Sequence, residues 1–475
     1  MNRHGFILAI LVILLAACNR NNPILIEKGI VFSQDTVSFD TVFTSKGSTT
    51  RIFKIYNTNR SDITIRHFRL GEGKYFHINI DGESDLSKLD DYLLAGGDSL
   101  FVFVSAFIDP QDANSPVLIA DNLNVETDDA SVAVRFEAYG QDVEILRELH
   151  IKSDTLLKGE KPYFVMRYVE VDSACTLTIN KGTIFYMADS AQLVVRGSLR
   201  AEGTLEEPIT FRGSRMYDIY DRVPYDYVSG LWGGIFLLTS EGSKNECSYL
   251  DIHSATVGLY CSAANSTPLP EIELLNCRIH NNAVYGLVLH NFNSKIVNCE
   301  LTNCSSYCVY IAGGNHTFVH NTIASYFNSS NVSLHSIGKE NVSAMFVNNL
   351  SKNNAKTHVT LSNSIVAGSS AHNFTLATPL PDYYQGLFHN NCLKTDSIAN
   401  TQFTDNIFIK SGDKLFANTY YNRNNGEYYN FSLDSLSLAR DTADINISLL
   451  YPTDRLGRSR LADGKPDIGC YEYSE

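Results

Sequence analysis

Short runs of alternating apolar and polar residues mark the first 145 positions of the chain. The clearest runs, separated by polar turn residues, lie at 51–56, 63–65, 76–80, 99–104 and 132–136. Alternation with a period of two predicts β-strands that bury one face. We therefore expect residues 24–145 to form an antiparallel β-sandwich. The segment contains no cysteine, which excludes a disulfide between its sheets.

A different period governs the chain beyond residue 160. The triplet at 177–179 recurs 22 residues later at 199–201. A five-residue pattern occurs at 275–279, 297–301, 319–323 and, after a further 42 residues, 361–365. A period in the low twenties with several short strands predicts a solenoid, and the missing LxxLxL frame excludes leucine-rich repeats. We expect an all-β chain in which residues 161–475 form a parallel β-helix and 146–160 form a connector.

The repeat also predicts which side chains face the interior of the solenoid. Alternation places Leu275, Cys277 and Ile279 inside. Their neighbours are expected outside: Asn276, Arg278 and His280. From coil to coil, the predicted inward column is Cys277, Cys299, Asn321 and Asn363. Stacked thiols have parallel Cβ vectors that do not suit a disulfide torsion, so we expect Cys277 and Cys299 to be reduced.

Three segments of the second part resemble known β-helix proteins. Residues 182–213 resemble the opening coils of right-handed parallel β-helix proteins of the pectin-lyase-like superfamily. Their sequence is GTIFYMADSAQLVVRGSLRAEGTLEEPITFRG. Residues 215–237 resemble the loop and re-entry strand of β-helix lipoproteins of Bacteroidetes. Residues 452–473 resemble their closing segment, with Cys470 where alanine is usual. The resemblance implies a right-handed β-helix, in a group of which many members have no assigned activity.

The first part resembles a different family. Three runs within residues 53–143 resemble the Hydin-like branch of immunoglobulin-like domains. They are FKIYNTNRSDITI, LLAGGDSLFVFV and EAYGQDV. Such domains are spacers or protein-binding units, so the resemblance implies no catalytic role for residues 24–145.

The N-terminus predicts export and lipidation. Arg3 precedes an apolar run at 6–15, which is too short to span a bilayer and is typical of a signal peptide. The run ends in Leu15-Ala16-Ala17-Cys18, which resembles the lipobox of bacterial lipoproteins and implies cleavage before an acylated Cys18. We expect residues 1–17 to be the signal and 18–23 the lipidated tether. The alternative is a plain signal peptide cut after Ala17. We expect attachment to the bacterial outer membrane, with the periplasmic and surface faces both open.

Charge and motif content narrow the function. The chain has 38 Lys and Arg against 52 Asp and Glu, a net charge of −14, which argues against a nucleic-acid partner. The paired aspartates and basic run of polygalacturonase-like members of the superfamily are missing beyond residue 150. We therefore assign no catalytic residue and no cofactor. Calcium would be expected only if the chain were a polysaccharide lyase.

The loop at 215–232 is the predicted binding site. Aromatic faces stack on sugar rings, while carboxylates and arginine bind sugar hydroxyls. The candidate residues are Tyr217, Tyr220, Tyr225, Tyr227, Trp232, Asp218, Asp221, Arg222 and Asp226. Two alternatives are a loop that packs its tyrosines on the solenoid, and an acid/base pair of aspartates within the same loop.

His253 and His280 occupy equivalent positions after inward-facing isoleucines, so we expect them to stack on one outer face. The sequence offers no third ligand nearby. We therefore expect two solvated histidines and no metal site.

These observations favour a non-catalytic component of the cell envelope that binds a neutral polysaccharide or an envelope protein. The alternative is a polysaccharide lyase or glycoside hydrolase with the pectin-lyase-like fold, because β-helix active sites assemble from several coils without a local motif.

Overall fold

The computed structural model describes residues 29–216, 218–220, 223–239, 242–327, 343–421 and 428–474. The chain divides into two compact units, Met1–Val143 and Glu144–Glu475. The predicted signal and Cys18 lie outside the described residues. Within the described ranges, no helix has the length and apolar character that a membrane crossing needs.

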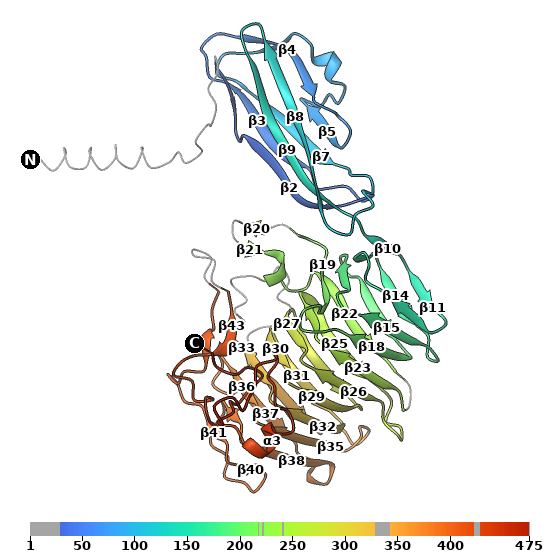
Figure 1. Cartoon of the computed structure of the whole chain (residues 1–475), viewed down its shortest axis with the longest axis vertical. Coiled ribbons are helices and arrows are strands. Elements are labelled where there is room, and N and C mark those ends of the chain that lie inside the picture. Colours follow the sequence, from blue (N-terminus) through green and yellow to red (C-terminus); the bar gives the residue numbers. More distant parts are fainter. Residues whose placement is uncertain are drawn as a thin grey trace, which may run out of the picture. The chain divides into compact units, whose positions relative to one another are not determined.

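The first unit is a β-sandwich (Figure 1). One sheet, antiparallel throughout, has the order β1 (Ile30–Phe32), β3 (Arg51–Asn57), β7 (Ser99–Ala106) and β5 (Phe76–Ile80). The other has the order β2 (Thr36–Phe43), β9 (Ser131–Gln141), β8 (Val117–Thr127), β4 (Ile63–Leu70) and β6 (Tyr92–Leu94), with only β2 and β9 parallel. A short 3₁₀ turn, η1, spans Leu86–Leu89.

Alternation fills the core of the sandwich. In β7, Leu100, Val102 and Val104 are buried, whereas Phe101 and Phe103 between them are exposed. The five alternating runs of the sequence fall in β3, β4, β5, β7 and β9, so the predicted sandwich is confirmed.

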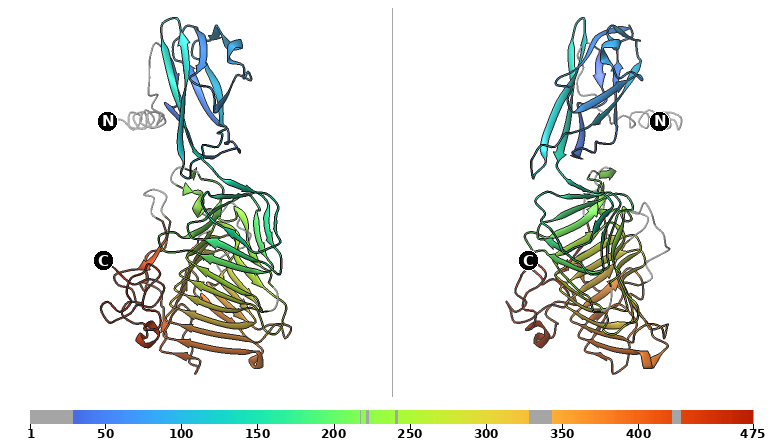
Figure 2. Two further views of the ribbon diagram at one scale, coloured as in Figure 1. Left: turned by 45° about the vertical axis from the view of Figure 1, so that its right-hand side comes forward. Right: turned by 90° about the vertical axis from the view of Figure 1, so that its right-hand side faces the viewer.

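The second unit is built from three long parallel sheets, which Figure 2 shows as stacked coils. Sheet 1 contains β10 (Glu144–Leu146), β13 (Tyr163–Val165), β16 (Ile184–Met187), β19 (Ile209–Gly213), β24 (Leu250–His253), β27 (Arg278–Asn282), β30 (Glu300–Cys304), β33 (Thr322–Ser325), β36 (Ile365–Gly368), β39 (Cys392–Leu393) and β41 (Ile407–Phe408). Sheet 2 contains β11 (Leu149–Ile151), β14 (Tyr168–Val171), β17 (Gln192–Val195), β22 (Trp232–Leu237), β25 (Ala255–Ser262), β28 (Tyr285–His290), β31 (Tyr307–Ala312), β34 (Met345–Asn348) and β37 (Phe374–Ala377). Sheet 3 contains β12 (Thr155–Leu157), β15 (Thr176–Asn180), β18 (Ser198–Glu202), β23 (Lys244–Ser248), β26 (Glu271–Leu275), β29 (Asn293–Val297), β32 (Gly314–Val319), β35 (Thr357–Ser362), β38 (Tyr384–His389) and β40 (Phe403–Thr404).

Smaller elements decorate the coils. Two short antiparallel pairs are β20 (Asp218–Tyr220) with β21 (Val223–Pro224), and β42 (Phe416–Asn418) with β43 (Asn430–Leu433). The 3₁₀ turns η2 (Tyr225–Tyr227) and η3 (Pro381–Tyr383) and one helical turn, α3 (Ile445–Ser448), complete the described elements.

The strand register confirms the 22-residue repeat. Leu177 pairs with Leu199, and Ile279 pairs with Leu301, which in turn pairs with Ile323. The predicted connector at 146–160 was wrong. Strands β10, β11 and β12 pair in parallel with β13, β14 and β15, so this segment forms the first coil.

A left-handed residue turns the chain from sheet 3 into sheet 1 on successive coils. The φ angles of these corner residues lie between 47° and 56° at Asn276, Asn298, His320, Asn363 and Asn390. Asparagine tolerates this conformation better than most residues. The corner interrupts strand alternation, so the prediction for Leu275 was wrong: its side chain is 37% exposed, and Leu274 is the buried neighbour.

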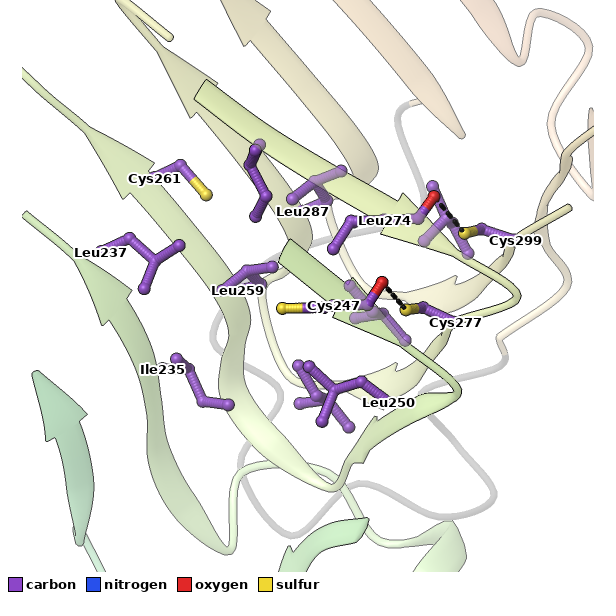
Figure 3. Packing of buried hydrophobic residues seen from close by; sticks show 14 of the residues in the cluster. Ile235, Leu237, Cys247, Leu250, Leu259, Cys261, Leu274, Cys277, Leu287 and Cys299 are labelled. Carbon is purple, nitrogen blue, oxygen red and sulfur yellow. Dashed lines mark hydrogen bonds between the residues drawn. The ribbon is translucent and has the colours of Figure 1, made fainter. Parts of the chain in front are cut away.

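An inward polar column follows each corner residue, as Figure 3 shows for the two stacked thiols. Cys277 Sγ lies 3.4 Å from the Cys247 carbonyl, and Cys299 Sγ lies 3.6 Å from the Leu274 carbonyl. The nine cysteines of the described residues are free and buried, which confirms the reduced thiols. Asn321 continues the column as predicted.

The prediction that Asn363 is the next member of the column was wrong. Thr322 pairs with Ile365, so Ser364 is the residue beside Asn321, and Asn363 is the corner. The coil from Thr322 to Ile365 spans 43 residues, one more than the 42-residue spacing of the sequence pattern. The column still carries hydrogen bonds, because the Ser364 amide donates to Asn391 Oδ1 at 2.9 Å.

Replacing Asn321 tests this column. Its Oδ1 accepts from the Cys299 amide at 2.9 Å and its Nδ2 donates to the Ile296 carbonyl at 2.8 Å, with the side chain fully buried. Asn321→Ala leaves the buried Cys299 amide without its partner, which should cost about 1–3 kcal/mol of unfolding free energy.

The measurement is urea unfolding followed by the fluorescence of Trp232, the single tryptophan, which lies in the β-helix. The control, Asn315→Ala, changes an exposed side chain and should shift stability by about 0.5 kcal/mol or less. Equal transitions for the two variants would contradict the role of the column.

Candidate functional site

The structure places part of the predicted loop, 215–232. Tyr217, Asp221 and Arg222 lie outside the described residues. Asp218 and Tyr220 belong to β20, whose backbone pairs with β21. The remaining predicted residues are described together with their contacts.

Trp232 lies inside the β-helix. Its indole is 1% exposed and extends a stack of aromatic rings formed by Tyr163, Phe185 and Phe211. Its Nε1 donates to the His253 carbonyl at 2.9 Å. The ring therefore presents no free face on which a sugar could stack.

The loop tyrosines also pack against protein. Tyr225 is buried, and its hydroxyl accepts a hydrogen bond from Arg215 Nη1 at 2.9 Å. Tyr227 stacks on Tyr428, with ring centroids 4.3 Å apart and planes 9° apart. This arrangement agrees with the alternative in which the loop covers the solenoid.

Asp226, by contrast, belongs to a charged cluster on the outer face of sheet 1. Its Oδ1 lies 2.6 Å from Arg212 Nη2 and 3.2 Å from His253 Nε2. Burial opposes ionisation, but the hydrogen bond from His253 and the charge of Arg212 outweigh it and lower the pKa of Asp226. The side chains of Ser254 and Asn281 donate to the Asp226 carbonyl and hold η2 against the sheet.

The predicted histidine stack is confirmed. His253 and His280 pair in register on β24 and β27, with ring centroids 4.9 Å apart. The expectation of solvated rings was wrong, because the two residues are 7% and 6% exposed. Asp251 supplies the missing third group, since its Oδ1 lies 3.1 Å from both His253 Nδ1 and His280 Nε2.

Burial and neighbouring charges shift the pKa values of the two histidines in opposite directions. Burial lowers the pKa of His253, but hydrogen bonds to Asp226 and Asp251 outweigh it and raise the pKa above its ordinary value. Burial and the Arg278 charge lower the pKa of His280 to about 4. The sequence signal for the third group was Asp251 itself, two residues before His253 and therefore on the same face of the strand.

An ion pair lies beside this group. Arg278 Nε is 2.9 Å from Glu300 Oε1, and Glu300 also accepts a hydrogen bond from the Tyr471 hydroxyl. Burial opposes ionisation of Glu300, but Arg278 and Arg455 outweigh it and lower its pKa to about 2. A cavity of about 330 Å³ lies here, and its lining includes Asp251, Arg278, Glu300, Arg455 and Tyr471.

The corner residues bind the C-terminal segment, residues 441–473, on this side of the solenoid. Nδ2 of Asn298, Asn363 and Asn390 donates to the carbonyls of Thr453, Asp444 and Thr442, respectively. Buried Arg460 reaches back to Asn298 Oδ1 at 2.9 Å and pairs with Glu472 at 2.7 Å. The C-terminal segment therefore packs on the solenoid and contacts Glu300 through Tyr471.

Sheet 2 carries a second feature, which we call the aromatic face. It consists of the half-buried side chains of Tyr260, Tyr285, Tyr307, Tyr310 and Phe346. Tyr285 and Tyr307 lie 6.0 Å apart with planes 9° apart, and Tyr310 and Phe346 lie 5.8 Å apart with planes 8° apart. The sequence pattern did not predict this face, because each coil contributes only one or two of its rings.

A hollow of about 290 Å³ lies on the outer face of sheet 3. Its lining includes Lys244, Glu246, Glu271, Glu273 and Lys295. Carboxylates outnumber ammonium groups among these residues, so the hollow does not suit a polyanionic ligand.

Residues 169–323 match the protein-family model described as a right-handed beta helix region. This part of the chain is a right-handed β-helix. No curated protein matches the chain. The match covers a third of the sequence, from β14 to β33, and includes the charged cluster around Asp251 together with most of the aromatic face.

Solved structures show only distant likeness to the chain. VesB protease of Vibrio cholerae has 13% identity and a TM-score of 0.18, over 24% of this chain and 32% of that one. A family 123 glycoside hydrolase from Clostridium perfringens has 9% identity and a TM-score of 0.17, over 23% and 25%. Dex49A from Penicillium minioluteum has 8% identity and a TM-score of 0.20, over 76% and 74%. The chain thus spans about a third and a quarter of the first two, and none of the three bears on its function.

Glu300→Gln tests the charged cluster. The substitution removes the buried carboxylate that pairs with half-buried Arg278 and should cost about 1.5–3 kcal/mol at pH 7. Because the folded-state pKa of Glu300 is about 2 and its ordinary value is 4.5, the stabilisation is present above pH 4.5 and is lost as the pH falls toward 2. The difference between variant and wild type should therefore shrink over that window.

Urea unfolding followed by Trp232 fluorescence at pH 7 and at lower pH measures both effects. The control is Glu273→Gln, which breaks the exposed pair with Lys295 and should cost about 1 kcal/mol or less. A loss in Glu300→Gln no larger than in the control would show that the buried pair does not stabilise the fold.

Proposed function

We propose that the protein is a lipid-anchored component of the bacterial cell envelope that binds a neutral glycan on the aromatic face without cleaving it. The observation that supports glycan binding most strongly is the set of half-buried rings on successive coils of sheet 2. Neighbouring strands lie about 4.8 Å apart, and the rings of Tyr285, Tyr307, Tyr310 and Phe346 are in mutual contact along the solenoid axis.

The chemistry of this face favours a neutral ligand. Strands β25, β28, β31 and β34 contain no Asp, Glu, Lys or Arg. The apolar faces of sugar rings pack on aromatic rings, and tyrosine hydroxyls remain able to bind sugar hydroxyls. A polyuronate would need positive charge that these strands lack.

The charged cluster argues against hydrolysis at sheet 1. Glycoside hydrolysis requires a carboxyl group that stays protonated near neutral pH to act as the general acid. Asp226, Asp251 and Glu300 all have lowered pKa values. These three residues therefore do not supply that acid.

Membrane attachment rests on the sequence Leu15-Ala16-Ala17-Cys18. A multiply acylated cysteine holds a protein at a membrane stably, whereas a single chain would not. We propose that acylation of Cys18 holds the β-sandwich and β-helix at the outer membrane.

The glycan proposal predicts the effect of removing the stacked rings. Tyr307→Ala and Tyr310→Ala should each weaken retention on neutral polysaccharides at least tenfold, about 1.4 kcal/mol, in affinity electrophoresis. Tyr139→Ala, an exposed tyrosine of the sandwich, is the control and should bind like wild type. Parallel assays for reducing and unsaturated ends should find none. Wild-type retention by both ring variants, or release of new ends, would refute the proposal.

The anchor proposal predicts a change in cell fractionation. Cys18→Ala should move the protein from the membrane fraction to the soluble exported fraction and abolish palmitate labelling. Cys175→Ala, which replaces a buried thiol of the β-helix, should leave both unchanged. Membrane retention of the Cys18 variant would contradict lipidation.

A further inference from the structure

Three metal-ligating side chains converge on the outer face of sheet 1. Asp251 and His253 are two residues apart on β24, so they share a face, and His280 lies beside His253 on β27. One donor atom from each of the three lies within 4.8 Å of the others. In the described part of the chain, this is the one group of three or more His, Cys, Asp or Glu side chains with that geometry.

The distances suit a tetrahedral ion. Zinc bonds of 2.0–2.2 Å to nitrogen and oxygen place neighbouring ligands about 3.3–3.5 Å apart. Asp251 Oδ1 lies 3.1 Å from each of the two ring nitrogens. Two imidazoles and one carboxylate form a donor set typical of zinc, whereas calcium and magnesium prefer oxygen ligands.

A second, independent feature is the group that orients His253. Its other ring nitrogen, Nε2, lies 3.2 Å from Asp226 Oδ1, and Arg212 fixes that carboxylate at 2.6 Å. Metal-ligating histidines commonly donate their free ring N–H to a carboxylate in this way. Trp232 Nε1 also donates to the backbone carbonyl of His253 and fixes the strand.

The surrounding charges leave room for a cation. Arg278 lies 3.9 Å from Asp251 Oδ2, but its closer partner is Glu300 at 2.9 Å. Asp251 Oδ1 faces the two imidazoles instead. Asp251 also lines the cavity of about 330 Å³, so its carboxylate borders open space that could hold a water ligand.

We propose that Asp251, His253 and His280 form a binding site for a divalent transition metal of the zinc class, with Asp226 as a positioning residue for His253. The ligands stand on two hydrogen-bonded strands, so the site is held by the sheet before the ion arrives. Because Asp226 belongs to η2, the bound ion also stabilises the contact between η2 and sheet 1. The site is independent of the aromatic face and of glycan binding.

The test uses untagged, full-length protein stripped of metal and then titrated with Zn²⁺ in a calorimeter. We expect one equivalent to bind. We also expect the Co²⁺ complex to show the intense visible absorption of a four-coordinate ion. His280→Ala should weaken binding at least about 100-fold, and Asp226→Asn about 10–100-fold. The control His358→Ala, which removes a histidine of β35 in sheet 3, should bind like wild type.

Two outcomes would overturn the proposal. One is a wild-type protein that binds far less than one equivalent of Zn²⁺ and shows no visible Co²⁺ bands, which would leave the group as a hydrogen-bonded network. The other is undiminished binding by His280→Ala. If that variant does not fold, His280→Gln and the wild-type Co²⁺ spectrum decide the question, because neither depends on the alanine variant.

Discussion

The coils of the β-helix can stack only if the buried backbone N–H and C=O groups at the corners have hydrogen-bond partners. An unpaired peptide group inside the solenoid would be strongly destabilising. The left-handed corner residues turn the chain from sheet 3 into sheet 1, and the residue after each corner points inward. Asn321 shows the principle, since its side chain bonds the Cys299 amide of one coil while its own amide bonds Ser364 of another. The polar column thus joins consecutive coils.

The same corners organise the outer surface. Asn298, Asn363 and Asn390 point their amides at the closing segment, and His320 Nε2 lies 3.0 Å from Ser448 Oγ. The segment consequently packs against the outer face of sheet 1, where Tyr471 contacts buried Glu300. Sheet 2 differs, because its outer face carries half-buried aromatic rings and no charge on four successive strands. The two faces of the β-helix therefore differ: sheet 1 carries buried charges beside the C-terminal segment, and sheet 2 carries aromatic rings.

The sequence predicted features that repeat with a constant period, and it failed where the period changes or where distant segments meet. The stacked thiols follow directly from the 22-residue spacing, whereas the histidine pair, 27 residues apart, follows from the equivalent positions of the two histidines after Ile252 and Ile279. Asn363 was misplaced because the coil from Thr322 to Ile365 spans 43 residues, one more than the 42-residue spacing of the sequence pattern, and Leu275 was misplaced because a corner breaks alternation. Trp232 looked like a sugar platform, but the aromatic stack that it extends comes from three neighbouring strands of sheet 1, β13, β16 and β19. Asp226 and His253 were each identified, yet only the fold of η2 onto sheet 1 joins them.

A crystal structure of the protein soaked with a neutral oligosaccharide tests the central claim most directly, namely that sheet 2 is the recognition surface. The account predicts sugar rings stacked along Tyr285, Tyr307, Tyr310 and Phe346, with their hydroxyls bonded to tyrosine hydroxyls. Sugar bound instead in the cavity beside Asp251, or in the hollow on sheet 3, with the aromatic face empty, would contradict it.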